Sequence, residues 1–179
     1  MRVITGSAKG RRLFEPKDSS VRPTTDMVKE AIFSIIQFDV PGRRVLDLFA
    51  GTGQLGIEAL SRGAGACVFV DNSPASLALV RKNLSHCGME AAVVRSDAIS
   101  YLRHAGKFDL ILIDPPYAEG LYNDVLNAVF MFDILNEGGI IIVESPENET
   151  LPDAPPPYAR GKRYRYGKIS LTVYTRNTT

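Results

Sequence analysis

Five short apolar runs between residues 45 and 143 form the most regular pattern in the sequence. They occupy residues 45–49, 67–71, 92–94, 110–113 and 140–143. Each run is almost continuously apolar, which is typical of strands that are covered on both faces. Stretches with helical spacing separate the runs, and this alternation predicts an α/β fold with a mainly parallel sheet.

Capping and stop signals indicate where the helices lie. Ser73 followed by Pro74 is typical of a helix start, and apolar residues then recur at helical spacing up to Gly88. Further helices are expected at residues 25–37, at residues 54–62 and at residues 121–135, the last one stopped by the glycines at 138 and 139.

The two ends of the chain follow different patterns. Residues 169–174 alternate apolar and polar side chains, which predicts a half-exposed last strand at or near an antiparallel edge. Two apolar pairs at 3–4 and 13–14 flank a glycine-containing loop, and they predict a loose hairpin. Residues 151–157 contain three consecutive prolines and are expected to form a connection outside the sheet interior.

The composition agrees with one ordinary domain. The chain has 179 residues, 45% of them hydrophobic and 23% charged. No apolar run approaches the roughly 20 residues that cross a bilayer, and the first residues are too briefly apolar for a signal peptide. Two isolated cysteines, Cys67 and Cys87, suit a reducing compartment. We therefore expect a cytoplasmic protein with no membrane partner, built as a hairpin extension (1–24) on a core (25–179).

The net charge of +1 conceals an asymmetry along the chain. Residues 1–44 carry 9 basic and 5 acidic side chains, residues 45–157 carry 6 and 15, and residues 158–179 carry 6 and none. An acidic centre therefore lies between two basic ends. This distribution favours a polyanionic partner that the ends hold.

A glycine-rich loop follows the first apolar run. The sequence from Gly51 to Gly56 fits the pattern G-x-G-x-x-G, opens a predicted helix, and is followed by Asp71 twenty residues after Gly51. By itself this pattern also fits a nicotinamide or flavin dinucleotide site. The loop alone therefore leaves a dinucleotide-dependent oxidoreductase open.

Acidic residues at the strand ends distinguish between these ligands. Asp47 precedes the loop, and Asp71, Asp97 and Asp114 follow three further strands. Ligands of open α/β sheets lie across the carboxyl ends of the strands, so these carboxylates should border one crevice. They would repel the two phosphates of a dinucleotide, whereas S-adenosylmethionine offers a sulfonium, an ammonium, two hydroxyls and an adenine amine.

Each aspartate has an expected role towards S-adenosylmethionine. Asp71 accepts from the ribose diol, Asp97 from the adenine amine, and Asp47 helps to place the methionine ammonium, while the loop backbone approaches the cofactor closely. The candidate cofactor-binding residues are Asp47, Phe49, Ala50, Gly51, Thr52, Gly53, Asp71, Asn72, Asp97 and Ala98.

The tetrapeptide Asp114-Pro115-Pro116-Tyr117 is the most specific signal for chemistry. Two prolines rigidify the loop and free nearby carbonyl groups from strand pairing. A planar base could stack on Tyr117 while its exocyclic amine donates to the Asp114 carboxylate and the Pro115 carbonyl. Catalysis would then come mainly from positioning and electrostatics, with Asp114 acting as a base or only as an acceptor. No metal is expected, because the two histidines lack ligand-like spacing.

An amine of this kind lies in a nucleic acid, so the target base must be extruded to reach the site. Phosphate contacts are expected from the basic ends of the chain, where three tyrosines at 158, 164 and 166 could stack on bases or simply pack. The candidate cations are Lys9, Arg11, Arg12, Arg22, Arg160, Lys162, Arg163, Arg165 and Lys168.

At this point the sequence resembles the bacterial 16S ribosomal RNA guanine-N2 methyltransferases of the RsmD type. The matching pieces are residues 2–6 with 10–13, residues 22–26 with 29–30, residues 46–53 with 58–64, and residues 114–117. The Arg-Pro-Thr-Thr-Asp and Glu-Ala-Leu-Ser-Arg-Gly-Ala segments are the most specific of these. Beyond residue 145 there is little motif to match.

The resemblance implies a class I, Rossmann-like methyltransferase fold with an antiparallel edge region and an N-terminal hairpin that helps to bind RNA. The implied substrate is a guanine of 16S rRNA or the small ribosomal subunit, the product cofactor is S-adenosylhomocysteine, and no obligate protein partner is evident. It adds Thr24 and Lys29 to the expected RNA contacts, although the family often has Arg in place of Met27 and Lys29, and Glu in place of Asp71.

Three alternatives stay open at this stage. The same loop would serve an adenine-N6 methyltransferase acting on DNA or RNA. A dinucleotide-dependent oxidoreductase is disfavoured by the four strand-end carboxylates. A non-catalytic RNA-binding module would need no intact cofactor crevice.

Overall fold

A computed structural model of the protein describes residues 1–18, 24–118 and 120–178. Its strands form one seven-stranded sheet in the order β3-β2-β1-β4-β5-β7-β6. The strands are β1 (Arg44–Leu48), β2 (Ala66–Asp71), β3 (Ala92–Arg95), β4 (Phe108–Ile113), β5 (Leu135–Pro146), β6 (Tyr158–Tyr166) and β7 (Ile169–Arg176). The helices are α1 (Asp26–Ile35), α2 (Gln54–Ser61), α3 (Pro74–His86), α4 (Ala98–His104) and α5 (Leu121–Phe132).

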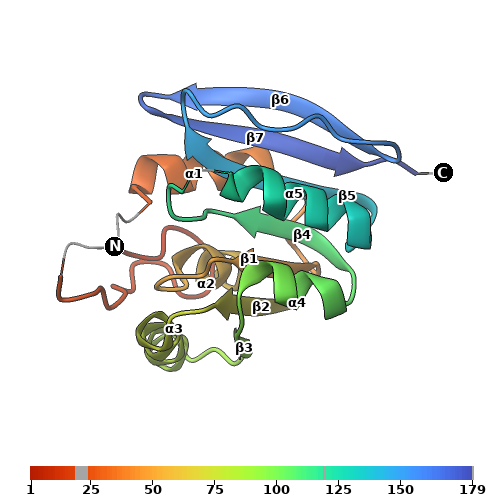
Figure 1. Cartoon of the computed structure of the whole chain (residues 1–179). Helices are drawn as coiled ribbons and strands as arrows, with labels where there is room; N and C mark the ends of the chain where they lie inside the picture. Colours follow the sequence, from red (N-terminus) through yellow and green to blue (C-terminus); the bar gives the residue numbers. More distant parts are fainter. Residues whose placement is uncertain (19–23, 119, 179) are drawn as a thin grey trace.

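The first five strands are parallel, as their continuously apolar runs predicted. Helices α1, α2 and α3 contribute to the core on one face of the sheet. Helices α4 and α5 contribute to the core on the other face. Figure 1 shows the carboxyl ends of these strands pointing to the same side, where the N-terminal segment and the β6–β7 turn also lie. The fold is therefore the mainly parallel α/β arrangement with an antiparallel edge region that the sequence predicted.

The antiparallel region is larger than expected. Strand β7 pairs with β5 on one side and with β6 on the other. Residues 169–172 are buried, so the prediction of a half-exposed last strand was wrong. Strand β6 takes the edge position instead, so β7 lies between β5 and β6. The basic side chains of β6 suit an edge, because charge there discourages pairing with another chain.

The boundary between α5 and β5 also differs from the prediction. The helix ends at Phe132, and Asp133 reverses the chain with a positive φ of 46°. Leu135 already belongs to β5, and Gly138 lies inside that strand, where the register with β4 shifts. The helical pattern continued to residue 135 because Ile134 and Leu135 are apolar and buried, although they belong to the turn and the strand.

The N-terminal extension is a loop held by a few bonds rather than a regular hairpin. Arg2 and Arg12 form a single antiparallel bridge. Glu58 of α2 accepts hydrogen bonds from the Ile4 and Thr5 amides at 2.8 and 3.0 Å. Gly6 has a φ of +91°, and a Cβ there would lie 1.7 Å from the Ser61 carbonyl oxygen, so only glycine fits. The extension is thus fastened to the helix that follows the glycine loop.

None of the helices in the described part of the chain is long and apolar enough to cross a membrane.

Candidate active site

The structure brings the predicted carboxylates to one edge of the sheet. Asp47 lies in β1, Asp71 ends β2, Asp97 follows β3 and Asp114 follows β4. Asp47 is close enough to Asp71 and Asp114 for their charges to raise its pKa. Asp71 and Asp97 line the same hollow. The four side chains therefore form one row across the carboxyl ends of the parallel strands, as the topology requires.

The turn from β1 into α2 is tightly constrained. Phe49 has a positive φ of 67°, which is rare for a bulky residue and marks stored backbone strain. Gly51 has a φ of +55°, and a Cβ at this position would meet nothing within 4 Å. The backbone of the loop is thus open on the side where a ligand would approach.

Asp71 holds this loop in place. Its Oδ2 accepts from the Gly51 amide at 2.9 Å and its Oδ1 accepts from the Ser73 amide at 2.8 Å. An ionised carboxylate has about four acceptor sites, so two of them are left for further donors. The same side chain can therefore fix the loop and accept from a ribose diol.

Asp47 is buried, with only 1% of its surface exposed. Its Oδ2 accepts from the Gly56 amide in the first turn of α2 at 2.9 Å. Burial and, to a smaller extent, the negative charges of Asp114 and Asp71 raise the pKa of this carboxyl to about 8, although the hydrogen bond from the Gly56 amide opposes the shift. A cation placed beside Asp47 would favour its ionised form, so the site is matched to a positively charged ligand.

A hollow beside the glycine loop is the place where the adenosine part of S-adenosylmethionine would fit. It is lined by Leu48, Phe49, Val70, Asp71, Asn72, Ser96, Asp97 and Ala98. Its enclosed volume is about 20 Å³, so an adenosine would lie along the open strand ends rather than inside a closed cavity. Apolar walls flanked by two carboxylates suit an adenine ring with a ribose diol. Five predicted cofactor residues outside the glycine loop, Phe49, Asp71, Asn72, Asp97 and Ala98, lie at this hollow.

Asp97 has a structural role as well. Its Oδ1 caps α4 by accepting from the Ser100 amide at 3.0 Å. Hydrogen bonding by the Ser100 side chain and by the Ser100 amide holds the pKa of Asp97 below its usual range. The side chain is exposed, so capping and contact with a ligand are compatible.

The Asp114-Pro115-Pro116-Tyr117 loop begins directly after β4. Asp114 is half-buried, Pro115 is buried, and the Tyr117 ring is 50% exposed. Burial raises the pKa of Asp114 to about 6, while a hydrogen bond from Thr24 lowers it. In its ionised form this carboxylate can accept hydrogen bonds from an amine.

An open groove adjoins this loop. It has a volume of about 350 Å³ and is lined by Tyr117, Pro146, Glu147, Asn148 and Lys168. The groove joins the end of β4, the end of β5 and the β6–β7 turn, all on the side where the parallel strands end (Figure 1). A planar base on the Tyr117 ring would lie beside polar groups from the other two segments.

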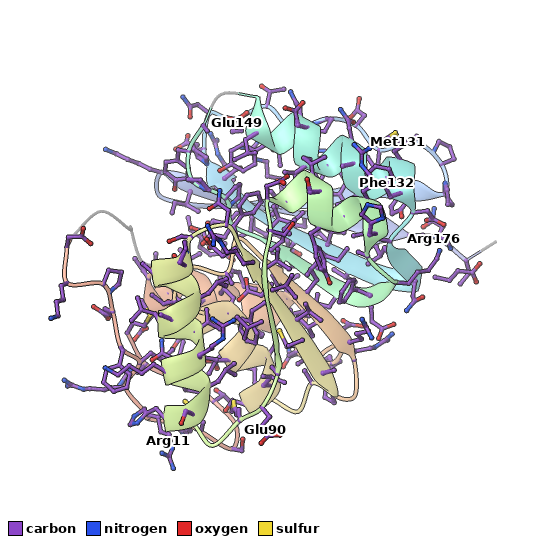
Figure 2. The ribbon with its side chains drawn as sticks, turned by 60° about the horizontal axis from the view of Figure 1, so that its bottom comes forward. Arg11, Glu90, Met131, Phe132, Glu149 and Arg176 are labelled. Carbon is purple, nitrogen blue, oxygen red and sulfur yellow. The ribbon has the colours of Figure 1, made fainter. Side chains whose placement is uncertain are left out.

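The candidate RNA contacts in the N-terminal segment have different surroundings. Lys9 and Arg12 are exposed. Arg11 is exposed too, but its Nη1 donates to the His86 carbonyl at 2.7 Å, and Figure 2 shows it beside the end of α3. Arg22 lies outside the described residues.

Two of the residues added by the resemblance do not lie on the surface. Thr24 is buried and its hydroxyl contacts Asp114 and Glu144. Lys29 is fully buried, donates to the Arg2 carbonyl and lies 3.8 Å from a Glu58 carboxylate oxygen. Their positions do not suit direct contacts with an RNA phosphate. Both residues instead join the N-terminal region to the core.

The basic C-terminal segment is only partly available to a ligand. Arg163 donates to the carbonyls of Pro146, Glu147 and Glu149 and so fastens the β5–β6 connection. Arg165 is exposed and pairs with Glu147. The tyrosines at 158, 164 and 166 pack against the two cores, so packing accounts for them without base stacking.

Two important polar residues were missed in the sequence. Glu144 follows the buried run of β5, and the rule that found the four aspartates would also have found it. Asn83 of α3 is fully buried and joins the Phe14 backbone to the Thr52 carbonyl of the glycine loop. No sequence motif marks Asn83, because its partners lie far away along the chain.

The described residues contain no group of three or more His, Cys, Asp or Glu side chains placed to hold a metal ion.

Fold and site together define a class I, Rossmann-like methyltransferase. A structure of the Escherichia coli protein yhhF superposes with a TM-score of 0.90 at 30% identity, covering 100% of this chain and 99% of that one. The family model described as Conserved hypothetical protein 95 matches residues 1–175. The chain belongs to this family, which confirms the RsmD-type resemblance.

Two curated relatives match over nearly their whole length. YlbH of Bacillus subtilis is 41% identical, covering 97% of this chain and 98% of the relative. Ribosomal RNA small subunit methyltransferase D of Escherichia coli strain K12 is 33% identical, covering 98% of this chain and 90% of the relative.

Proposed function

We propose that this protein transfers a methyl group from S-adenosylmethionine to the exocyclic N2 amine of a guanine in 16S ribosomal RNA. The family supports methyl transfer to small-subunit RNA, since the Escherichia coli relative carries that name. The observation that carries the chemical assignment is the position of Asp114. This half-buried carboxylate is close enough to Asp47 to raise its pKa, and it lies three residues before Tyr117, which lines the groove.

The cofactor would be held by the strand ends and the glycine loop. Asp71 accepts from the ribose diol, and Asp97, which lines the same hollow, accepts from the adenine amine. The methionine ammonium lies beside the buried Asp47 carboxyl group. When bound, S-adenosylmethionine supplies an electrophilic methyl group on a positively charged sulfur. The open backbone at Gly51 leaves room for its close approach.

The target amine would be held by the Asp114 loop. An exocyclic amine is a poor nucleophile because its lone pair is delocalised into the ring. The Asp114 carboxylate and the Pro115 carbonyl accept hydrogen bonds from the two N–H groups of this amine. These bonds turn the nitrogen lone pair towards the methyl group, while the base stacks on Tyr117. The new N–C bond would form as the methyl–sulfur bond breaks and S-adenosylhomocysteine is left. The Asp114 carboxylate or water would accept the proton that the nitrogen loses.

RNA would be gripped around this edge of the sheet. Exposed cations are available at Lys9 and Arg12 in the N-terminal segment and at Lys168 beside the groove. These charges hold phosphates while the base is extruded into the groove.

The test compares Asp114→Ala with Asp124→Ala, which removes an exposed acid from α5. Methyl incorporation from labelled cofactor into unmethylated small subunits is measured, together with S-adenosylhomocysteine affinity by calorimetry. Asp114→Ala should abolish methyl transfer and leave the cofactor affinity within about threefold of wild type. The reason is that the proposal assigns Asp114 to the target amine and not to the cofactor. Wild-type transfer rates in Asp114→Ala would refute the assignment.

A further inference from the structure

Three segments far apart in the sequence meet at one hydroxyl group. Thr24 Oγ1 lies 2.9 Å from Asp114 Oδ2 and 3.3 Å from Glu144 Oε2. Thr24 and Glu144 are 5% and 4% exposed. The hydroxyl therefore sits between the carboxyl group at the end of β4 and the one in β5, with almost no access to solvent.

Thr24 is held in this place by a rigid support. It directly precedes Thr25, whose hydroxyl caps α1 by accepting from the Val28 amide at 3.3 Å. Helix α1 buries Val28, Lys29, Ile32 and Phe33. The start of a well-packed helix thus fixes the Thr24 hydroxyl, so the hydroxyl can in turn fix the orientation of a neighbouring carboxyl group.

The hydrogen count of this cluster limits how it can be arranged. A threonine hydroxyl has one proton and can donate to only one of two carboxylates. The shorter contact assigns that donation to Asp114. The contact with Glu144 becomes a second hydrogen bond when the Glu144 carboxyl is protonated and donates to the hydroxyl oxygen. In both cases Asp114 Oδ2 is engaged by Thr24, and within the described residues Oδ1 is the oxygen left for a substrate.

We propose that Thr24 is a positioning residue, whose hydroxyl fixes the Asp114 carboxyl group in the orientation that receives the target amine, with Glu144 supporting the hydroxyl from the other side. The inference rests on the proposed function, because it assigns Asp114 to the amine. It gives Thr24 a role inside the protein in place of the RNA contact that the resemblance implied.

The test compares Thr24→Val with Thr24→Ser. Valine keeps the shape and removes the hydroxyl, serine keeps the hydroxyl, and Thr24→Ala is a second hydroxyl-free variant. Thr172→Val is the matched control, since it removes a fully buried hydroxyl that has no partner within the described residues. For each variant kcat and KM for small subunits are measured, with S-adenosylhomocysteine affinity.

Thr24→Val should lower kcat about 10- to 100-fold, because a misplaced carboxylate no longer orients the amine. Its KM and cofactor affinity should stay within about threefold, whereas Thr24→Ser should recover most of the wild-type kcat. Thr172→Val should leave kcat unchanged. An unchanged kcat in both hydroxyl-free variants would overturn the proposal.

A carboxyl titration by ¹³C NMR tests Thr24 independently of activity. The Thr24 hydrogen bond lowers the pKa of Asp114, so Thr24→Val should raise it and Thr24→Ser should not. Other described groups that act on this cluster are Asp47 of β1, Tyr117, Tyr122 of α5 and Glu144 of β5, and none of them is changed. If wild-type protein transferred no methyl group, the proposed function would fail, while an unmoved Asp114 pKa would overturn the role of Thr24.

Discussion

The carboxylate of Asp71 holds the backbone of Gly51, whose amide donates to Oδ2 across 2.9 Å. The residue expected to accept from the ribose therefore also fixes the loop that faces the cofactor. Because the other oxygen accepts from the Ser73 amide, this one side chain ties the glycine loop to the start of α3. Loop geometry and cofactor affinity should consequently change together when Asp71 changes.

Asp71→Asn tests this coupling. Asparagine offers one acceptor oxygen where aspartate offers two, so either the Gly51 or the Ser73 amide loses its partner. We expect the free energy of unfolding to fall by about 1–3 kcal/mol and the S-adenosylhomocysteine affinity to fall about 10-fold or more. Chemical denaturation and calorimetry measure the two effects. Reduced affinity with unchanged stability would contradict the coupling.

Asp47→Asn tests the burial of an ionisable group. Burial raises the pKa of Asp47 to about 8, whereas an unfolded aspartate has its usual value of 3.8. Between pH 3.8 and about pH 8 Asp47 is protonated in the folded protein and ionised in the unfolded chain. The free energy of unfolding of wild type therefore falls as pH rises through this range, by up to about 1.4 kcal/mol per pH unit. Asparagine does not titrate and can still accept from the Gly56 amide.

The stability of Asp47→Asn relative to wild type should therefore increase from pH 5 to pH 8. The cofactor affinity of this variant should be lower than that of wild type. Denaturation curves without cofactor at four pH values measure this. Parallel stability profiles for the two proteins would show that Asp47 does not titrate in this way.

Asn83→Ala tests the attachment of the N-terminal segment. Asn83 Oδ1 accepts from the Phe14 amide at 2.7 Å, and its Nδ2 donates to the Phe14 and Thr52 carbonyls at 3.1 and 2.9 Å. Removing these bonds should cost about 2–3 kcal/mol of stability. The amide of Phe14 should exchange with solvent much faster, before global unfolding. Ser85→Ala, at an exposed position of the same helix, is the control. Equal protection of Phe14 in both variants would be inconsistent with this role.

Lys9→Ala and Arg12→Ala test the expected phosphate contacts. Each variant should weaken RNA binding and reduce the slope of log affinity against log salt by about 1, since each removes one displaced counterion. Cofactor affinity should not change. Arg103→Ala removes an exposed cation near the end of α4, away from Asp97 at the start of that helix, and should leave the slope unchanged. An identical slope in all three variants would exclude the N-terminal segment from the RNA-binding surface.

The parallel sheet and its row of acids could be predicted from the sequence because both depend on local patterns. A strand buried on both faces needs an apolar run, and a turn such as the one at Gly51 needs glycine. Asp71, Asp97 and Asp114 could be placed at one edge because strand direction follows from the α/β alternation.

Features that depend on distant partners could not be predicted in this way. Strand β6 consists largely of polar residues, and its edge position is defined by pairing with β7. Lys29 is a cation that normally lies in solvent, but here burial lowers its pKa and the charge of Glu58 opposes that shift. Thr24 belonged to a motif, yet only the fold brings its hydroxyl to Asp114, ninety residues away.

The adenine-N6 alternative makes a different product from the same loop. An adenine amine could also donate to Asp114 and the Pro115 carbonyl, so loss of activity in loop variants does not separate the two substrates. The identity of the methylated base does.

The most direct measurement is methyl incorporation from labelled S-adenosylmethionine into small ribosomal subunits that lack the modification, followed by nucleoside mass spectrometry. Wild-type protein should produce N2-methylguanosine in 16S rRNA, and Asp114→Ala should produce none. Labelled N6-methyladenosine as the product, or no incorporation by the wild-type protein, would contradict the proposed function.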